Sequence, residues 1–172
     1  DYLEKPVDGA VLARALRHPT AGLVGTDVLI VDDDEVARTV LAQQLRALGC
    51  TSRVAENGAV ALARVAERRP DLVLLDLSMP TMDGFEFMQR LRADESVAAI
   101  SVVFHTATYS EPQANELALA CGVRRVLPKP CEPERILEAV AEELGEAASA
   151  PLPVTPAPPE SRASVLAPLG NT

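Results

Sequence analysis

The chain has 172 residues, of which 48% are hydrophobic and 24% are charged, so it can form one globular domain of roughly 150 residues with a short excess. Its net charge of −9 argues against nucleic acid as a partner, because binding to phosphates requires clustered lysine and arginine side chains. No run reaches the roughly 18 apolar residues of a membrane-spanning helix, and the three cysteines, which lack a Cys-x-x-Cys spacing, are typical of reduced thiols in a cytoplasmic protein.

The first nineteen residues resemble a later segment of the same chain. Residues 1–19 and 125–141 share an aliphatic strand end, a Lys-Pro pair, an acidic residue two positions after the proline, and an amphipathic helix. Lys5 and Lys129 of these pairs are the only lysines in the sequence. We therefore predict that residues 1–19 are the last strand and helix of an upstream copy of the domain and that residues 20–26 are a linker. A chance match of two Lys-Pro pairs is the alternative.

Residues 27–144 alternate between short apolar runs and segments of helical periodicity. The predicted strands are 28–31, 52–55, 73–75, 102–104 and 124–127. Three of them are apolar throughout, as expected of parallel strands covered on both faces. The predicted helices are 36–48, 58–68, 84–92, 112–120 and 133–144. This alternation predicts an α/β fold with a five-stranded parallel sheet and helices on both faces.

The first predicted helix has the clearest periodicity. Its apolar residues recur at helical spacing and stop at Gly49, a glycine in the position that commonly ends a helix. These residues are Val36, Val40, Leu41, Leu45 and Leu48.

Residues 145–172 differ in composition from the rest of the chain. Six of the prolines lie here, and Glu146, Glu160 and Arg162 are the only charged residues. Such a segment buries too little apolar surface to offset the entropy of ordering it. We predict a disordered tail or linker, and a proline-rich binding motif is the alternative.

Carboxylates follow two of the predicted central strands. Asp32 and Asp33 come directly after residues 28–31, and Asp76 comes directly after residues 73–75. Since the carboxyl ends of parallel strands meet at one edge of the sheet, we expect these acids to converge there if the two strands are neighbours. Their mutual repulsion would be relieved by a divalent cation with oxygen ligands, and Mg²⁺ fits this description.

Helix capping is the alternative for part of this acidic group. Asp34 and Glu35 stand where an N-cap and the first helical turn are expected, and capping is the favoured interpretation for both. Capping accounts for at most one of Asp32 and Asp33. It does not account for Asp76, because Ser78 and the residues after it separate Asp76 from the next helix.

Two further strand ends add a hydroxyl and a cation at the same edge. Thr106 closes the strand that includes residues 102–104, and Lys129 closes the strand that includes residues 124–127. A compact ammonium group on a flexible stem suits contact with an oxygen anion. His105 is interpreted as an ordinary strand side chain, because a phosphorylatable histidine is expected on an exposed helix.

Four motifs, in this order and spacing, resemble the receiver domains of bacterial two-component response regulators. They are VDDD (31–34), LLDLSMPTMDG (74–84), HTA (105–107) and LPKP (127–130). The resemblance covers residues 27–144 and implies a doubly wound, flavodoxin-like sheet with strand order 2-1-3-4-5. It also identifies residues 1–19 as the end of a second receiver, which would make the chain part of a tandem array within a hybrid histidine kinase.

The resemblance implies that the domain accepts a phosphoryl group. Asp76 would be the acceptor, and the donor would be a phosphohistidine on a histidine kinase or a histidine phosphotransfer domain. Lys129 would pair with the phosphoryl oxygens, and Thr106 would hydrogen-bond to the phosphorylated side chain and signal its arrival. The domain would then be a signalling module that catalyses only its own phosphorylation and dephosphorylation.

The resemblance also implies a set of Mg²⁺ ligands. Asp33, Asp76 and the backbone carbonyl of Ser78 would bind the ion directly. Asp32 would hold it largely through water.

One position departs from the family pattern. Most receivers carry tyrosine or phenylalanine three residues before the lysine, where this domain has Val126. In the family pattern this aromatic ring swings in and out as the partner of the threonine in the switch. An aliphatic side chain cannot do so, and the alternative is therefore a structural or dimerisation receiver that is not phosphorylated. The family pattern predicts that partners, including a second receiver in a dimer, contact the last strand and the helices at 112–121 and 133–144.

Overall fold

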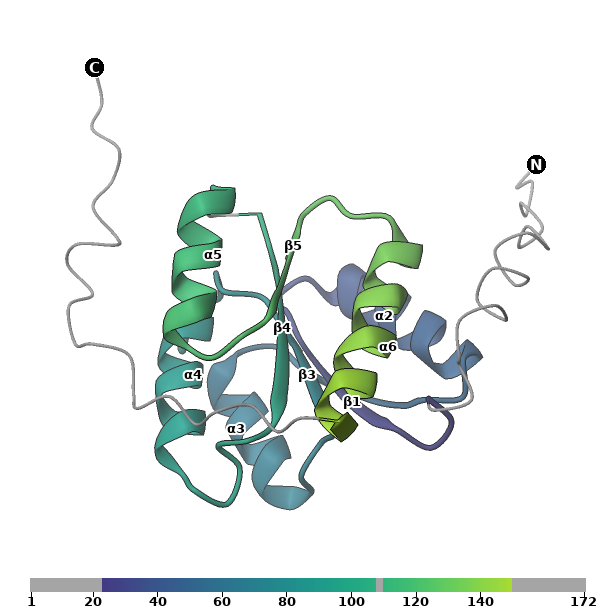
Figure 1. The fold of residues 1–172 in the computed structure, drawn as a ribbon, viewed down its shortest axis with the longest axis horizontal. Helices are drawn as coiled ribbons and strands as arrows, with labels where there is room; N and C mark the ends of the chain where they lie inside the picture. The colour runs from purple at the N-terminus through teal and green to yellow at the C-terminus, as the bar shows by residue number, and fades with distance from the viewer. Residues whose placement is uncertain (1–22, 108–109, 150–172) are drawn as a thin grey trace.

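The structure, a computed structural model, describes residues 23–107 and 110–149 (Figure 1). The strands are β1 (Asp27–Val31), β2 (Thr51–Ala55), β3 (Leu72–Leu75), β4 (Ser101–Thr106) and β5 (Arg125–Pro128). The helices are α2 (Glu35–Ala47), α3 (Gly58–Glu67), α4 (Gly84–Ala93), α5 (Glu111–Ala120) and α6 (Pro133–Ser149). The paired strands are all parallel and lie in the order β2-β1-β3-β4-β5. The predicted α/β fold and its strand order are confirmed.

The position of each strand in the sheet follows from its sequence. β1, β3 and β4 are central and buried along their whole length, as predicted for runs without exposed polar positions. β2 and β5 are the edge strands, and each combines buried residues with more exposed ones. The mixed polarity of β2 and β5 is therefore a consequence of having one neighbour instead of two.

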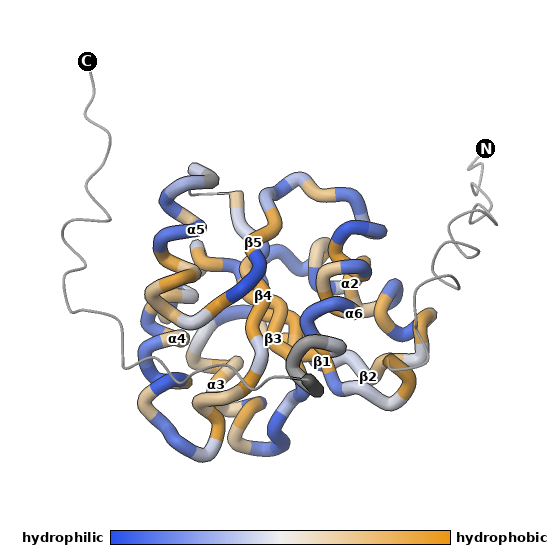
Figure 2. Tube along the Cα trace, viewed as in Figure 1, coloured by the Kyte–Doolittle hydropathy of each residue, from blue (hydrophilic) through white to orange (hydrophobic). Residues whose placement is uncertain are grey.

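Helices cover both faces of the sheet. Figure 1 shows α3, α4 and α5 on one side of the strands and α2 and α6 on the other. Successive strand residues point to opposite faces, so Val73 and Phe104 pack in the first core, and Leu74 and Val103 pack in the second. The apolar strands accordingly lie at the centre of the molecule in Figure 2.

Only part of the apolar stripe of α2 is buried. Leu41 and Leu45 are buried, whereas Val36 and Val40 are 70% and 43% exposed. Val36 and Val40 are left outside the core, because a helix on one face of a sheet buries only the side turned toward the strands. The predicted end of the helix is confirmed, since Gly49 follows it with a left-handed φ of +86°.

Two boundaries of the described domain differ from those expected. α6 continues to Ser149 instead of ending at Leu144, because residues 146–149 include glutamate and alanine, which favour helix, and no proline lies between Pro133 and Pro151. Leu23, from the expected linker, is buried in the core beneath α2 and α6, and its carbonyl oxygen accepts a hydrogen bond from Cys50 Sγ at 3.5 Å.

Other expectations fall outside the described residues. The upstream strand and helix at 1–19 and the proline-rich segment from residue 150 onward belong to this group. Within 23–107 and 110–149, none of the helices combines the length and apolar character needed to cross a lipid bilayer.

Candidate functional site

Acidic side chains from two neighbouring strands meet at the carboxyl edge of the sheet. Val31 of β1 and Leu75 of β3 are in register, so the residues that follow them, Asp32 and Asp76, emerge side by side. Oxygen atoms of Asp32, Asp33 and Asp76 all lie within 4.8 Å of one another. Asp32 and Asp76 are 2% and 6% exposed, whereas Asp33 is exposed. The convergence expected from the strand ends is therefore found.

An ammonium group from a third segment contacts two of these acids. Lys129 follows β5, and its Nζ donates hydrogen bonds to Asp32 Oδ2 at 2.5 Å and to Asp76 Oδ2 at 3.0 Å. Its backbone N donates to the carbonyl oxygen of Thr106 at 3.0 Å. The Lys129–Pro130 peptide bond is cis, an option that the sequence left open. Acids and ammonium thus come together from strands that are far apart in the chain.

Backbone amides hold the carboxylates in place. The amide of Ser78, an exposed residue, donates to Asp76 Oδ1 at 3.1 Å, and the amide of Asp34 donates to Asp32 Oδ1 at 2.9 Å. The side chain of Asp34 accepts from the amides of Val36 and Ala37 as the N-cap of α2. The capping interpretation of Asp34 is confirmed, and Asp32 and Asp76 are left as the acids that face Lys129.

Burial and charge act in opposite directions on this group. The pKa of Asp76 is raised, mainly by burial, although the Ser78 amide and Lys129 act to lower it. Burial acts to lower the pKa of Lys129, but its hydrogen bonds to Asp32 and Asp76 outweigh that effect and the pKa is raised. Lys129 therefore keeps its positive charge at neutral pH.

The chemistry of the donor set fits Mg²⁺. Three carboxyl groups gather at this site and one ammonium contacts two of them, so ionised acids leave a surplus of negative charge in a partly buried pocket. Hard divalent cations take carboxylate and carbonyl oxygens as ligands, and the three acids present such oxygens within 4.8 Å of one another. The residues present therefore fit the predicted ion.

β4 ends at this edge with two buried polar side chains. Thr106 is 3% exposed and pairs in register with Pro128, the residue before Lys129. His105 is 7% exposed and lies within the strand, as predicted. Burial, with a smaller contribution from the positive charge of Lys129, lowers the pKa of His105 from 6.5 to about 4. The imidazole is therefore neutral at physiological pH.

His105 is expected to weaken the folded state in mild acid. Its folded pKa of about 4 lies below its ordinary value of 6.5, so the unfolded chain binds the proton first and stability falls as the pH drops from 6.5 toward 4. The loss is about 2 kcal/mol at pH 5. Urea denaturation of wild type and His105→Met between pH 7 and pH 5 checks this, because the variant should lose less stability than wild type over that range. Parallel pH dependences of the two proteins would contradict the prediction.

Val126, the position at which the family pattern expects an aromatic ring, lies on β5. It pairs in register with Phe104 and is half-buried against the core that contains Phe104. The Val126 side chain therefore packs against the core from an edge strand of the sheet.

Two residues to which the sequence analysis gave no role contact the site. A Cβ atom on Gly84 would lie 2.6 Å from the carbonyl oxygen of Asp76 and 2.8 Å from Leu77 Cα, so α4 begins directly against the backbone of Asp76 and Leu77. Arg38 Nη1 donates to the carbonyl oxygen of Asp32 at 2.6 Å. Gly84 could have been suspected as the last residue of the motif 74–84, whereas Arg38 had no signal beyond its place one turn into the helix.

Gly84→Ala is expected to destabilise the protein by about 1 to 3 kcal/mol, because the added methyl group would collide with backbone atoms that cannot move aside. Gly145→Ala is the matched control, since a Cβ atom at that position of α6 meets nothing within 4 Å. The control should be neutral or stabilising by up to about 1 kcal/mol. Urea denaturation of both variants tests the difference, and equal stabilities would contradict it.

Comparison with known proteins places the chain in a family. Residues 28–141 match the response regulator receiver domain. The phosphate regulon transcriptional regulatory protein PhoB of Pseudomonas aeruginosa is 35% identical over 126 residues, which are 72% of this chain and 55% of that protein. The chain therefore spans about half the length of the curated relatives it matches.

Solved structures agree with this assignment. The chemotaxis protein CheY4 of Vibrio cholerae superposes with a TM-score of 0.64 at 28% identity, covering 69% of this chain and 98% of that one. The signal receiver domain of a signal transduction histidine kinase from Syntrophus aciditrophicus gives a TM-score of 0.66 at 27% identity, covering 73% and 95% of the two chains. Family match, fold and relatives agree, and the chain belongs to the response regulator receiver domain family, the signalling domain of bacterial two-component systems.

Proposed function

We propose that this domain accepts a phosphoryl group on Asp76 in a Mg²⁺-dependent step, from a phosphohistidine on a histidine kinase or a histidine phosphotransfer domain. The observation that carries the proposal is the meeting of three acids and one ammonium. Oxygen atoms of Asp32, Asp33 and Asp76 lie within 4.8 Å of one another, and Lys129 Nζ contacts two of the three acids. Phosphoryl transfer requires mostly positioning and neutralisation of charge, and these groups supply both.

The residues of the chain have separate tasks in this transfer. A carboxylate oxygen of Asp76 forms the new bond to phosphorus while the bond between phosphorus and the donor's imidazole nitrogen breaks, and that nitrogen then takes a proton from solvent. Lys129 pairs with the transferred phosphoryl oxygens, which it can reach because its Nζ is already 3.0 Å from Asp76 Oδ2. Asp32, Asp33, Asp76 and the Ser78 carbonyl would hold Mg²⁺, which neutralises developing negative charge when bound.

Thr106 and Lys129 would report the new phosphoryl group. Thr106 closes β4 at the same edge of the sheet as Asp76, and its carbonyl oxygen already accepts a hydrogen bond from the amide of Lys129. A hydrogen bond from the Thr106 hydroxyl to the phosphorylated side chain would therefore connect Asp76 with β4 and with the segment that follows β5.

The wider setting proposed for the domain is a tandem array inside a hybrid histidine kinase. The repeated Lys-Pro segments at 1–19 and 125–141 support it, as does the likeness to a receiver domain named as part of a histidine kinase. The relative PhoB is instead named as a transcriptional regulatory protein, which is a different kind of output. The sequence on both sides of this chain would decide between these outputs.

Intact mass measurement tests the proposed transfer. The full chain is incubated with acetyl phosphate as a small phosphodonor, with MgCl₂ or with EDTA. We expect a single phosphoryl adduct in the presence of Mg²⁺, none in EDTA, and none with Asp76→Asn. Asp71→Asn is the control, because Asp71 is an exposed acid directly before β3, at the amino ends of the strands and away from the site. Absence of an adduct on wild type, or an adduct that survives Asp76→Asn, contradicts the proposal.

A structural or dimerisation receiver that does not cycle phosphate is the second candidate. Val126 favours it, because this half-buried aliphatic side chain stands where the family pattern has an aromatic switch. The complete set of acids with Lys129 favours phosphorylation. The mass measurement separates the two candidates, since only the first requires an adduct on Asp76.

A further inference from the structure

We propose that Arg38 is a positioning residue for the acidic cluster, and that its guanidinium fixes the backbone turn that carries Asp32 and Asp33. The inference rests on the function proposed above. Arg38 is half-buried one turn into α2, and its Nη1 donates to the carbonyl oxygen of Asp32 at 2.6 Å. Helical side chains lean toward the N-terminus of their helix, so an arginine at this position reaches back over the turn that precedes α2.

This contact completes a set of restraints on Asp32. The amide of Asp34 donates to its Oδ1 at 2.9 Å, and Lys129 Nζ donates to its Oδ2 at 2.5 Å. With Arg38 on the carbonyl oxygen, every oxygen atom of Asp32 accepts a hydrogen bond. The side chain and the peptide group of Asp32 are therefore fixed by three different donors.

Asp33 depends on this restraint more than the other two acids do. It is exposed, and within the part of the chain that the structure describes its carboxylate has no hydrogen bond or ion pair. Its place within 4.8 Å of the other acids is consequently set by the backbone between residues 32 and 33. The oxygen atom of that same peptide group is the one that Arg38 holds.

The positive charge of Arg38 and its hydrogen bond have opposite effects on a bound cation. A guanidinium near the acids repels Mg²⁺, so a purely electrostatic role predicts that removing Arg38 tightens Mg²⁺ binding. A positioning role predicts that removing it weakens binding, because the turn that presents Asp33 is no longer held. The sign of the change in affinity therefore distinguishes the two roles.

Arg46 is a matched control on the same helix. It also donates to a backbone carbonyl oxygen, that of Ser52, at the longer distance of 3.4 Å. Eight residues of helix place it about 12 Å further along the axis of α2, away from the acids. Arg46→Met and Arg38→Met remove the same charge and the same kind of donor, and both keep an unbranched, helix-favouring side chain.

The experiment is an NMR titration of the full chain with MgCl₂, without a phosphodonor, in wild type, Arg38→Met, Arg38→Lys and Arg46→Met. We expect Arg38→Met to raise the Kd for Mg²⁺ about tenfold, the lower end of the effects seen for groups that orient metal ligands. Arg46→Met should stay within about twofold of wild type. Arg38→Lys keeps a donor and the charge on a shorter side chain, and its Kd should lie between those of wild type and Arg38→Met.

A second readout reports the turn itself. In the presence of EDTA, Arg38→Met should shift the amide resonances of Asp33 and Asp34 and leave that of Ser78 near its wild-type position, because Ser78 lies on the other acidic segment. An unchanged or lower Kd in Arg38→Met overturns the proposal, and so does an equal rise in Arg46→Met. If Arg38→Met does not fold, Arg38→Lys decides: a Kd above wild type supports the proposal, and an unchanged Kd overturns it.

Failure of this inference and failure of the proposed function give different results. If wild type binds Mg²⁺ and forms the Asp76 adduct while Arg38→Met matches its Kd, the positioning role alone is lost. If wild type binds no Mg²⁺ at millimolar concentrations, the metal site of the proposed function is lost and the positioning role is lost with it.

Discussion

Lys129→Met is expected to destabilise the Mg²⁺-free protein by about 3 kcal/mol and to slow phosphorylation of Asp76 roughly a hundredfold. The stability loss arises because Lys129 Nζ contacts Asp32 and Asp76 at once, so its removal leaves two buried carboxyl groups without their cationic partner. The slower reaction follows from the loss of the only ammonium beside Asp76 within the described residues. Urea denaturation in EDTA and timed intact mass spectra measure the two effects.

Mg²⁺ should restore part of the lost stability in Lys129→Met, because a cation that binds only the folded state stabilises it and neutralises the same acids. Arg69→Met is the control. It removes one positive charge from an exposed residue before β3, at the amino ends of the strands. This variant should change stability by no more than about 0.5 kcal/mol. Equal stabilities of the two variants in EDTA would show that Lys129 does not offset the negative charge of the buried acids.

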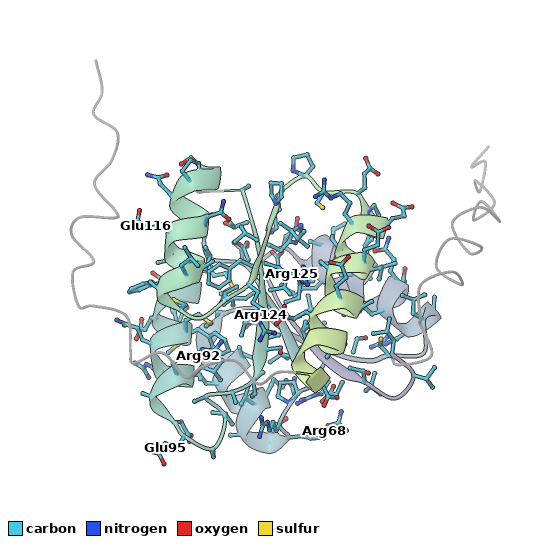
Figure 3. All side chains as sticks on the ribbon, viewed as in Figure 1. Arg68, Arg92, Glu95, Glu116, Arg124 and Arg125 are labelled. Carbon is cyan, nitrogen blue, oxygen red and sulfur yellow. The ribbon has the colours of Figure 1, made fainter. Side chains whose placement is uncertain are left out.

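Glu143→Ala is expected to lower the free energy of unfolding by about 3 to 5 kcal/mol, since it removes one partner from a buried group of charges. The Glu143 side chain is 0% exposed, and its carboxylate oxygens lie 3.6 Å from Arg124 Nη1 and 3.4 Å from Arg125 Nε. Arg125 is the first residue of β5 and Arg124 directly precedes it, and Figure 3 shows both arginines between α5 and α6. Glu143 also acts on a third arginine, Arg92: burial lowers the pKa of the Arg92 guanidinium, and the negative charge of Glu143 opposes that shift.

The neighbouring glutamate provides a close control for this prediction. Glu142 also pairs with Arg125, at 3.1 Å, but its side chain is 57% exposed. Water screens that pair, so Glu142→Ala should cost only about 0 to 1 kcal/mol. Urea denaturation of both variants at neutral pH gives the comparison. A loss of less than about 1 kcal/mol in Glu143→Ala would contradict the account of a buried charge that needs its partners.

Local patterns predicted the strands and helices well, but they did not show which side of each helix is buried. The central strands were recognisable because β1 and β3 contain uninterrupted apolar runs, which only a strand covered on both faces requires. The spacing in α2 groups Val36 and Val40 with Leu41, yet only Leu41 of these three is buried. Which side of a helix turns to the sheet depends on the neighbouring elements, and no short window of sequence contains them.

The burial of Glu143 illustrates the same limit. In the sequence it is one of several acids in α6 and would be placed on the solvent side. The fold buries it where the start of β5 and the residue before it bring Arg125 and Arg124 within ion-pair distance. A contact between residues almost twenty positions apart leaves no periodic trace in either segment.

The sequence by itself determined the order of strands and helices, the parallel sheet, and the placing of Asp32, Asp76, Thr106 and Lys129 at strand ends. These follow from residue periodicity and from the handedness of strand–helix–strand connections, which act over short stretches of chain. Only the tertiary structure decided that Lys129 contacts Asp32 and Asp76 together, that Arg38 holds the carbonyl oxygen of Asp32, and that Gly84 lies against the backbone of Asp76. Such contacts depend on how whole elements pack against each other, because a difference of one or two ångströms in that packing makes or breaks a hydrogen bond.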